Sequence, residues 1–282
     1  MPDTTVTEIV ATVAAGDGYP LGHRLWRGPA GRALLVMQHG VLTHSGWFAE
    51  IGRRLAARGV DVLGHDRRGS GLNAEARGDV DGPQRLLDDL HAVVAPHRAA
   101  YPTIVHFGWC LGCTLGLRYL LGRPEMGEGL VWMSPDVYER HLRPAVLDAF
   151  ARPIWDDRVT PRLKVPVPPE IYTDGPALDG FVRRDPLKLT DMTPRFLRAT
   201  VRLKEDLEEA VASFTAPSLL ILAGRDRIVD NERTRRLYER IGSARPRVVT
   251  FDCNHGIQFE ALDELVGVLA DFVESTAERR AA

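Results

Sequence analysis

The sequence predicts an α/β fold in which helices cover both faces of a mostly parallel central sheet and a cap is inserted. Strand-like and helix-like patterns alternate in the first and last parts of the chain. The apolar runs show no alternation of polar and apolar residues, which is typical of strands covered on both faces of a parallel sheet. A proline-rich segment interrupts this alternation, and we expect it to lie over one end of the sheet.

The individual elements follow from these patterns in chain order. Residues 1–135 form the first part of the predicted core, with strands at 33–37, 60–64, 103–107 and 129–133 and helices at 47–57, 85–94 and 111–121. Residues 136–200, which include Val165-Pro-Val-Pro-Pro169, form the predicted cap. Residues 201–282 form the second part of the core, with strands at 218–223 and 247–251 and helices at 231–241 and 259–275. One long helix is expected at 195–214.

The composition excludes several classes of protein. The chain has 282 residues, a net charge of −2 and no basic run, which argues against a nucleic-acid binder. The N-terminal MPDTTVTEIV lacks a signal sequence, and no apolar stretch approaches the roughly 20 residues that cross a bilayer. Three cysteines form no disulfide framework. We therefore expect a cytoplasmic protein without membrane insertion; nothing in the sequence indicates its oligomeric state.

A candidate nucleophile follows the strand expected at 103–107. The pentapeptide Gly108-Trp109-Cys110-Leu111-Gly112 is a G-x-nucleophile-x-G elbow with Cys in the place of Ser. Its two glycines permit a sharp turn from strand to helix, which exposes the central side chain above the sheet. A thiol at this point lies at a helix N-terminus, where the partial positive charge favours the thiolate.

Two further strand ends carry the partners that such a nucleophile needs. Asp226 follows the strand expected at 218–223, and His255 follows the strand expected at 247–251. Nucleophile, acid and base thus come in the chain order of this kind of site, in which the base accepts the thiol proton and the carboxylate orients the imidazole. Asp252 is the alternative acid. The backbone N–H groups of Val41 and Leu111 are the predicted donors to the oxyanion.

Several motifs together identify a resemblance over nearly the whole chain. They are His39-Gly-Val-Leu-Thr-His-Ser-Gly-Trp-Phe48, His65-Asp-Arg-Arg-Gly-Ser-Gly71, the elbow, Ser134-Pro135, Asp185-Pro-Leu187, Gly224-Arg-Asp226 and Asn254-His255. In this order they resemble the monoacylglycerol lipase and lysophospholipase-like branch of the α/β-hydrolases, the serine aminopeptidase S33 group. The resemblance implies an α/β-hydrolase fold, the Val41 and Leu111 oxyanion hole, and the roles of Asp226 and His255. The usual Gly-His-Ser-Met-Gly elbow is here Gly-Trp-Cys-Leu-Gly.

Other interpretations of the cysteines stay open at this stage. Cys is often a small buried hydrophobe, which would make the chain a non-catalytic ligand-binding homologue. Cys110-Leu-Gly-Cys113 is also a C-x-x-C sequence at the start of a helix, as in redox pairs. A Ser replaced deliberately by Cys110 would leave the hydrolase interpretation unchanged. The retention of all three partners favours an enzyme.

The predicted activity is acyl transfer through a thioester on Cys110. Hydrolysis of an ester or thioester is the main interpretation, and transfer of the acyl group to an amine or alcohol is the alternative, since both use the same residues. The expected partner is a small-molecule acyl substrate, including a coenzyme A or carrier-bound thioester. We expect no cofactor and no metal ion. Candidate substrate-binding residues are Trp109, His39, Arg183 and Arg184, the last two as a paired cationic site.

Overall fold

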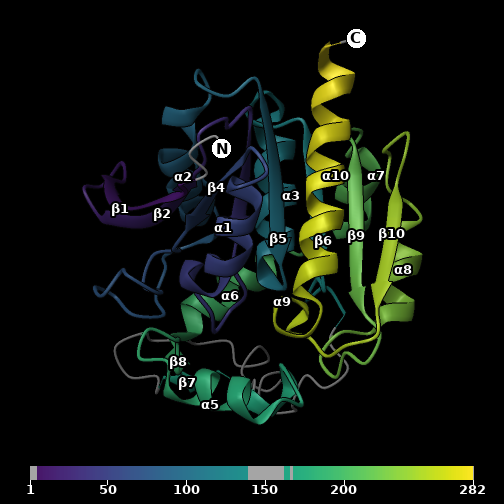
Figure 1. Cartoon of the computed structure of the whole chain (residues 1–282). Coiled ribbons are helices and arrows are strands. Elements are labelled where there is room, and N and C mark those ends of the chain that lie inside the picture. Colours follow the sequence, from purple (N-terminus) through teal and green to yellow (C-terminus); the bar gives the residue numbers. More distant parts are fainter. Residues whose placement is uncertain (1–4, 139–161, 166–167, 282) are drawn as a thin grey trace.

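The computed structural model describes residues 5–138, 162–165 and 168–281, and it has the predicted α/β-hydrolase architecture (Figure 1). One sheet has the strand order β1-β2-β4-β3-β5-β6-β9-β10. The strands are β1 (Thr7–Ala14), β2 (Pro20–Arg27), β3 (Ala33–Gln38), β4 (Val60–His65), β5 (Thr103–Trp109), β6 (Gly129–Met133), β9 (Ser218–Ala223) and β10 (Arg247–Phe251). From β4 to β10 all neighbours are parallel, whereas β2 pairs antiparallel with both β1 and β4. The prediction of a mostly parallel sheet is confirmed.

Helices cover both faces of this sheet. One face carries α1 (Ala49–Ala56), α9 (Ile257–Glu260) and α10 (Leu262–Ala281), and the other carries α2 (Pro83–Val94), α3 (Leu111–Gly122), α7 (Leu207–Ser213) and α8 (Asn231–Tyr238). Short 3-10 turns are η1 (Ser45–Phe48), η2 (Ala95–His97), η3 (Pro124–Met126) and η4 (Pro169–Ile171). All six residues of β3 are buried, and they alternate between the two cores: Leu34 and Val36 face one, Leu35 and Met37 the other. Burial on both faces explains the unalternated apolar runs.

The described part of the cap lies beyond the carboxyl ends of the parallel strands (Figure 1). It contains the antiparallel pair β7 (Leu163–Lys164) and β8 (Asp191–Met192), then α5 (Pro176–Arg184) and α6 (Pro194–Arg202). Residues 139–161 and 166–167 of the expected cap, 136–200, lie outside the described residues. The division into core and cap at 135 and 200 therefore stays a prediction.

The prediction of one long helix at 195–214 is wrong. The structure has two helices there, α6 and α7, because the chain turns between them and Asp206 adopts a left-handed backbone with φ of 49°. Contacts from outside the segment hold this turn: the Arg118 side chain of α3 donates to the Leu203 carbonyl, and Lys204 pairs with Asp136. Tertiary contacts thus override a local sequence that favours helix.

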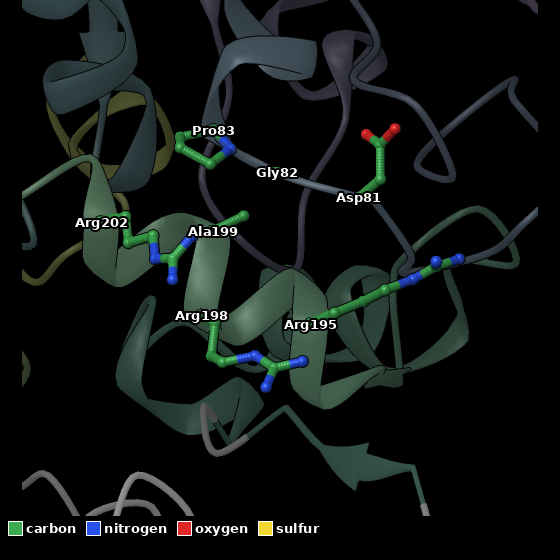
Figure 2. Close-up of a pocket in the computed structure, with 7 residues that line it drawn as sticks. All are labelled: Asp81, Gly82, Pro83, Arg195, Arg198, Ala199 and Arg202. Atoms are coloured by element: carbon green, nitrogen blue, oxygen red, sulfur yellow. The ribbon is translucent and has the colours of Figure 1, made fainter. Parts of the chain in front are cut away.

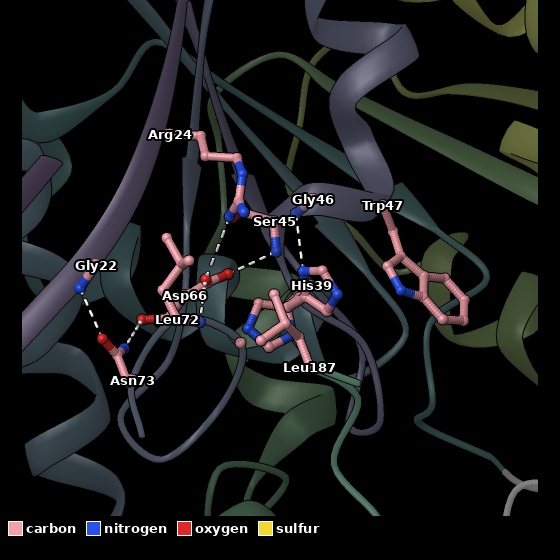
Figure 3. A network of polar contacts seen from close by, with 12 residues as sticks. Gly22, Arg24, His39, Ser45, Gly46, Trp47, Asp66, Leu72, Asn73 and Leu187 are labelled. Atoms are coloured by element: carbon pink, nitrogen blue, oxygen red, sulfur yellow. Dashed lines mark hydrogen bonds and ion pairs between the residues drawn. The ribbon is translucent and has the colours of Figure 1, made fainter. Parts of the chain in front are cut away.

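The hairpin of β1 and β2 was not predicted from the sequence. Most residues of β1 are exposed, so its pattern lacks the apolar run that identified the other strands. The hairpin matters for the site because it helps to anchor the loop after β4. Asp66 in that loop accepts hydrogen bonds from the backbone of Ser45 and Leu72, and lies 3.6 Å from the Arg24 guanidinium of β2 (Figure 3). Asn73 completes the network by accepting from the Gly22 N–H of β2.

Candidate active site

The elbow has the geometry that its glycines predict. Cys110 lies between β5 and α3 with φ of 55° and ψ of −119°, a left-handed backbone that is rare for a residue with a side chain. A Cβ on Gly108 would lie 2.3 Å from the backbone of Cys113, and one on Gly112 would lie 2.1 Å from the Gln38 carbonyl oxygen. Only glycine fits at both positions. Cys110 therefore stands at the N-terminus of α3, at the carboxyl edge of the sheet.

His255 and Asp226 form a closed pair at the same edge. Nδ1 of His255 lies 2.8 Å from Oδ2 of Asp226, and neither side chain is exposed to solvent. Oδ1 of Asp226 accepts the backbone N–H groups of Ile228 and Val229 at 2.8 and 3.0 Å. Burial acts to raise the pKa of Asp226, but the charge and hydrogen bond of His255 and the two backbone donors lower it below its ordinary value. A carboxylate held in this way fixes the Nδ1–H tautomer and leaves Nε2 as the base.

The Nε2 atom of His255 is fully buried and has no hydrogen-bond partner within the described ranges. The loop between β10 and α9, which carries His255 and is called the histidine loop below, contacts the elbow directly. Trp109 donates from its indole Nε1 to the His255 carbonyl at 3.3 Å, and the two rings lie 5.6 Å apart. The structure thus brings the predicted base and acid to the residue that precedes Cys110. Asp252, the alternative acid, is 88% exposed and pairs with Arg225, so it does not orient His255.

The loop after β3 borders the nucleophile. A Cβ built on Gly40 would lie 3.2 Å from the Cys110 Cβ, so Gly40 lies against the Cys110 side chain. Neither the Val41 N–H nor the Leu111 N–H donates to another residue in the part of the chain that the structure describes. Both predicted oxyanion donors are thus available. His39 is fully buried and accepts the Arg67 N–H at Nε2, so its Nδ1–H donates to the Gly40 carbonyl.

His39 therefore shapes this loop. Burial and the nearby Arg67 lower the pKa of its imidazole well below the ordinary value, which keeps it neutral. Trp109, the other candidate substrate contact next to the nucleophile, is also fully buried. Its ring packs on Trp47, Phe48 and Tyr172 as well as on His255. Both side chains thus build the walls of the site.

Arg183 and Arg184, the proposed cationic pair, lie exposed in the last turn of α5. The Arg183 guanidinium donates to Glu170 of the same cap at 3.0 Å. We assign neither of them a step of the chemistry. Cys113, the second cysteine of the C-x-x-C sequence, is buried, and its thiol donates to the Gly108 carbonyl at 3.1 Å. Cys110 and Cys113 form no disulfide, and burial raises the pKa of Cys113 well above its usual value, so this thiol has no thiolate character.

Two residues at the site were missed by sequence reasoning. Arg67 is the second residue after the end of β4 and is 1% exposed. The rule that places functional residues just after each strand would have found it. Tyr172 lies in the irregular cap, where no periodicity assigns a side chain to a face, and it is 3% exposed. Its ring lies 5.6 Å from that of His255 and 5.7 Å from that of Trp109.

The segment Tyr172–Asp174 fastens the cap to the histidine loop. The Tyr172 carbonyl accepts the Gly256 N–H at 2.9 Å, and the Asp174 carboxylate accepts from Asn254 at 2.7 Å and from Arg227 at 2.6 Å. Burial raises the pKa of the Tyr172 hydroxyl well above its ordinary value, and the nearby Cys110 and Asp226 add to this effect. The hydroxyl thus stays protonated beside the candidate triad.

A second anchor joins the cap to η1. Asp185, at the end of α5, accepts from Trp47 Nε1 at 2.6 Å and from His44 Nε2 at 3.0 Å. The Gly46 N–H donates to Nδ1 of His44, which leaves the proton on Nε2. Trp47 then packs on Tyr172, on Phe181 of α5 and on Phe259 of α9, with ring centroids 5.4 to 5.5 Å apart. An aromatic cluster from the core and the cap therefore packs against Trp109 and His255 of the candidate site.

A separate hollow lies between the start of α2 and one side of α6 (Figure 2). Its lining includes Asp81 and three arginines of α6, Arg195, Arg198 and Arg202. None of Cys110, Asp226 and His255 lines it. In the described ranges, no group of three or more His, Cys, Asp or Glu residues is arranged to hold a metal ion. Over the same ranges, none of the helices has the length and apolar character needed to cross a membrane.

The chain is similar to several known proteins. The model of the family described as Serine aminopeptidase, S33, matches residues 29–261. A monoacylglycerol lipase of Mycolicibacterium smegmatis is 23% identical over 216 residues, covering 75% of this chain and 76% of that protein. The monoglyceride lipase of Mus musculus is 25% identical over 282 residues, covering 94% and 89%. The chain also matches an uncharacterised abhydrolase domain-containing protein of Dictyostelium discoideum at 22% identity, of which it spans 30%.

Solved structures show the same fold. A soluble variant of monoglyceride lipase from Saccharomyces cerevisiae, in complex with a substrate analogue, superposes with a TM-score of 0.85 at 16% identity, covering 98% of this chain and 97% of that one. The monoacylglycerol lipase of Paleococcus ferrophilus superposes with a TM-score of 0.77 at 20% identity, covering 96% and 99%.

Proposed function

The chain belongs to the serine aminopeptidase S33 family of α/β-hydrolases, and from that premise we propose that it hydrolyses an ester or thioester through an acyl intermediate on Cys110. One observation carries the proposal: the enclosed His255–Asp226 pair lies against an elbow whose central residue has the left-handed backbone of a nucleophile. The names of the relatives, monoacylglycerol and monoglyceride lipases, support a small-molecule ester as the substrate class.

The reaction starts with proton transfer from the Cys110 thiol to Nε2 of His255. The sulfur then bonds to the carbonyl carbon of the substrate, and the carbonyl oxygen becomes an oxyanion that accepts from the N–H groups of Val41 and Leu111. The C–O or C–S bond to the leaving group breaks, and His255 returns the proton to the departing alcohol or thiol. Water next gives a proton to His255 and attacks the acyl thioester, and the C–S bond to Cys110 breaks as the sulfur regains its proton.

Sulfur as the nucleophile narrows the substrate class. A thiolate attacks readily but is also a good leaving group, so an amide would return to substrate unless its amine is well protonated. Thioesters and activated esters leave as easily as the enzyme's own sulfur. Thioesters of coenzyme A or of a carrier protein therefore join small esters as candidate substrates.

Acyl transfer to an amine or alcohol is the second candidate function. The observation that favours it is enclosure: Cys110 is 6% exposed, His255 is fully buried, and the aromatic cluster with Tyr172 covers both. A site that limits water lets another acceptor take the acyl group. The thioester intermediate is also more reactive toward amines than an oxygen ester would be.

Intact-mass spectrometry tests the proposed function directly. The protein is incubated with a panel of acyl thioesters, activated esters and a monoacylglycerol, and both the protein mass and the released products are measured. We expect an adduct with the mass of the acyl group on Cys110, and free acid as the product. Cys110→Ala should carry no adduct and should lose turnover, since removal of a triad nucleophile costs on the order of 10⁶-fold.

Cys110→Ser is the matched variant, because Ser is the usual residue of the family at this position. We expect it to fold and to hydrolyse esters more slowly than the Cys protein. Turnover of Cys110→Ala within about tenfold of the unmutated protein would contradict the assignment, being far short of the loss expected for a nucleophile. Ligand binding without adduct or product across the panel would favour the non-catalytic interpretation.

A further inference from the structure

Arg67 lies beneath the predicted oxyanion hole. It is the second residue after β4 and is 1% exposed, and its guanidinium lies below the loop 39–41. Nη1 donates to the His39 carbonyl at 2.5 Å, and Nη2 donates to the carbonyls of Gly40 at 2.9 Å and Val41 at 3.2 Å. Its backbone N–H donates to His39 Nε2 at 3.1 Å. One side chain thus holds three successive carbonyls of the loop.

These hydrogen bonds from Arg67 fix the direction of the Val41 N–H. The peptide bond between Gly40 and Val41 is planar and trans, so its C=O and N–H point in opposite directions. Arg67 and the Nδ1–H of His39 both hold the Gly40 carbonyl, and the Val41 N–H must therefore point away from the guanidinium. The same peptide borders the nucleophile, because a Cβ on Gly40 would lie 3.2 Å from the Cys110 Cβ.

The guanidinium is also a buried charge paired only with neutral groups. No carboxylate of the described residues lies within ion-pair distance of Arg67, and the acceptors of its guanidinium are the backbone carbonyls of His39, Gly40 and Val41. Burial lowers the pKa of Arg67 to about 10, while the negative form of Cys110, followed by Asp66 and Asp136, acts in the opposite direction. Arg67 is thus a cation at neutral pH. A buried cation without a counter-ion is costly unless an anion forms nearby.

We infer that Arg67 is the positioning residue of the oxyanion hole and the electrostatic partner of the Cys110 thiolate. The first role rests on the proposed function, because it concerns the acyl oxyanion. The second concerns the resting protein and can be measured without any substrate. No motif of the nucleophile, base or acid contains Arg67, and sequence reasoning gave it no role.

The elements next to the elbow carry further titratable and charged groups. They are His39 after β3, Cys113 of α3, Asp136 after β6 with its partner Lys204, Tyr172 of the cap, Asp226 after β9 and His255 after β10. Asp136 and Asp226 are carboxylates, which oppose a thiolate. Tyr172 stays protonated and His39 stays neutral. Asp136 is already paired with Lys204 at 3.0 Å, and His255 must be neutral to act as base, so Arg67 is the cation that acts on the Cys110 thiolate.

The test uses alkylation of Cys110 by iodoacetamide as a function of pH, followed by peptide mapping. The variants are Arg67→Gln, which loses the charge, and Arg67→Lys, which keeps a charge but cannot span three carbonyls. In Arg67→Gln we expect the pH midpoint of alkylation to rise by about one unit or more, as for a thiolate that loses a nearby cation. In Arg67→Lys the midpoint should stay close to that of the unmutated protein.

Steady-state kinetics on the best acyl substrate separates the positioning role. Both variants should lose kcat by about 100-fold, the usual effect of losing one oxyanion donor, with little change in KM. Arg68→Gln is the matched control. Arg68 is also buried, but it pairs with Asp89 through two hydrogen bonds of 2.8 Å and contacts no part of the loop 39–41. It should lose stability and keep the alkylation midpoint.

Each outcome has a defined meaning. If folded Arg67→Gln keeps the alkylation midpoint of the unmutated protein, the thiolate role is wrong. If Arg67→Lys keeps full kcat, the positioning role is wrong, whatever the midpoint does. If no acyl substrate is turned over by the unmutated protein, the proposed function fails, but the alkylation profile still decides the thiolate role. If Arg67→Gln does not fold, Arg67→Lys and Arg68→Gln still decide between a positioning and a purely structural role.

Discussion

Nδ1 of His255 lies 2.8 Å from Oδ2 of Asp226, and neither side chain is exposed to solvent. The other carboxylate oxygen is occupied by two backbone donors, so the carboxylate cannot rotate away from the imidazole without losing them. The pair therefore holds one tautomer of His255 before any substrate arrives. This relationship gives the sharpest prediction about the base.

Asp226→Asn should lower kcat by about 10⁴-fold, as the corresponding change does in serine proteases, because the amide can donate to Nδ1 and so place the proton on Nε2. The fold should persist, since the side chain keeps its size and one acceptor oxygen for Ile228 and Val229. Asp252→Asn is the control, because Asp252 is 88% exposed, and it should keep full activity. Equal losses in the two variants would mean that Asp226 does not orient the base. Steady-state kinetics on a common acyl substrate measures both.

Cys113→Ser should leave turnover nearly unchanged. The Cys113 thiol is buried and donates to the Gly108 carbonyl, a bond that a serine hydroxyl can also make. Cys113→Ala should cost about 1 kcal/mol of unfolding free energy, the usual worth of one hydrogen bond, again with little change in turnover. Loss of activity in Cys113→Ser, together with a reductant-sensitive Cys110–Cys113 disulfide in peptide maps, would instead support a redox pair.

The sheet and the positions of the candidate triad residues after its strands were predictable from the sequence, for a physical reason. β5, β6 and β9 are buried on both faces, so apolar residues dominate each of them, and a parallel sheet brings the residues after these strands to one edge. The hairpin of β1 and β2 escaped because its outer strand is mostly exposed. The break between α6 and α7 escaped because Arg118, far away in the sequence, supplies the contact that stops the helix.

The site was predictable only where a residue sits in a strand-to-helix turn. Cys110, Asp226 and His255 stand in such turns, and each follows a recognisable strand. The Tyr172 ring packs on His255 because of the way the cap folds, and no local sequence pattern predicts that fold. Arg67 stands after a predicted strand, but nothing in the sequence shows that its side chain turns back under the neighbouring loop.

Asp185→Asn should loosen the cap. Burial acts to raise the pKa of Asp185, but hydrogen bonds from His44 and Trp47 lower it from 3.8 to about 2. A carboxyl group with a lowered pKa in the folded state stabilises the protein above its unfolded pKa, and this contribution is lost as pH falls toward the folded value. Thermal unfolding should therefore show a lower Tm for Asp185→Asn at pH 7, and the difference should shrink as pH falls from about 4 toward 2.

The same variant should raise KM more than it lowers kcat, since Asp185 holds the cap to Trp47 and does not touch the candidate triad. Asp191→Asn is the control. Asp191 is another cap carboxylate, but its side chain pairs with Arg162, also in the cap, and its bond to Thr190 is local. A Tm difference between Asp185→Asn and the unmutated protein that does not change with pH would mean that the charge of Asp185 is not what anchors the cap.

The last prediction concerns the fate of the acyl group. Amines added during turnover of an acyl thioester should be acylated at the expense of free acid, because the intermediate is a thioester and the aromatic cluster limits water at Cys110 and His255. Tyr172→Ala removes the ring that covers His255 and should shift the products back toward free acid. Tyr172→Phe keeps that ring and should behave like the unmutated protein, unless the hydroxyl itself takes part.

The partitioning of products distinguishes hydrolysis from acyl transfer. An acyl thioester is supplied with a series of primary amines and alcohols, and free acid, amide and ester are quantified by mass spectrometry for the three proteins. Free acid alone across the series, even at high acceptor concentration, would leave a dedicated hydrolase. If one acceptor captures most of the acyl flux at concentrations where the others do nothing, a second specific site must exist, and transfer becomes the better description of the reaction. If Tyr172→Ala then keeps the same partition as Tyr172→Phe, the selection against water comes from elements other than the Tyr172 ring.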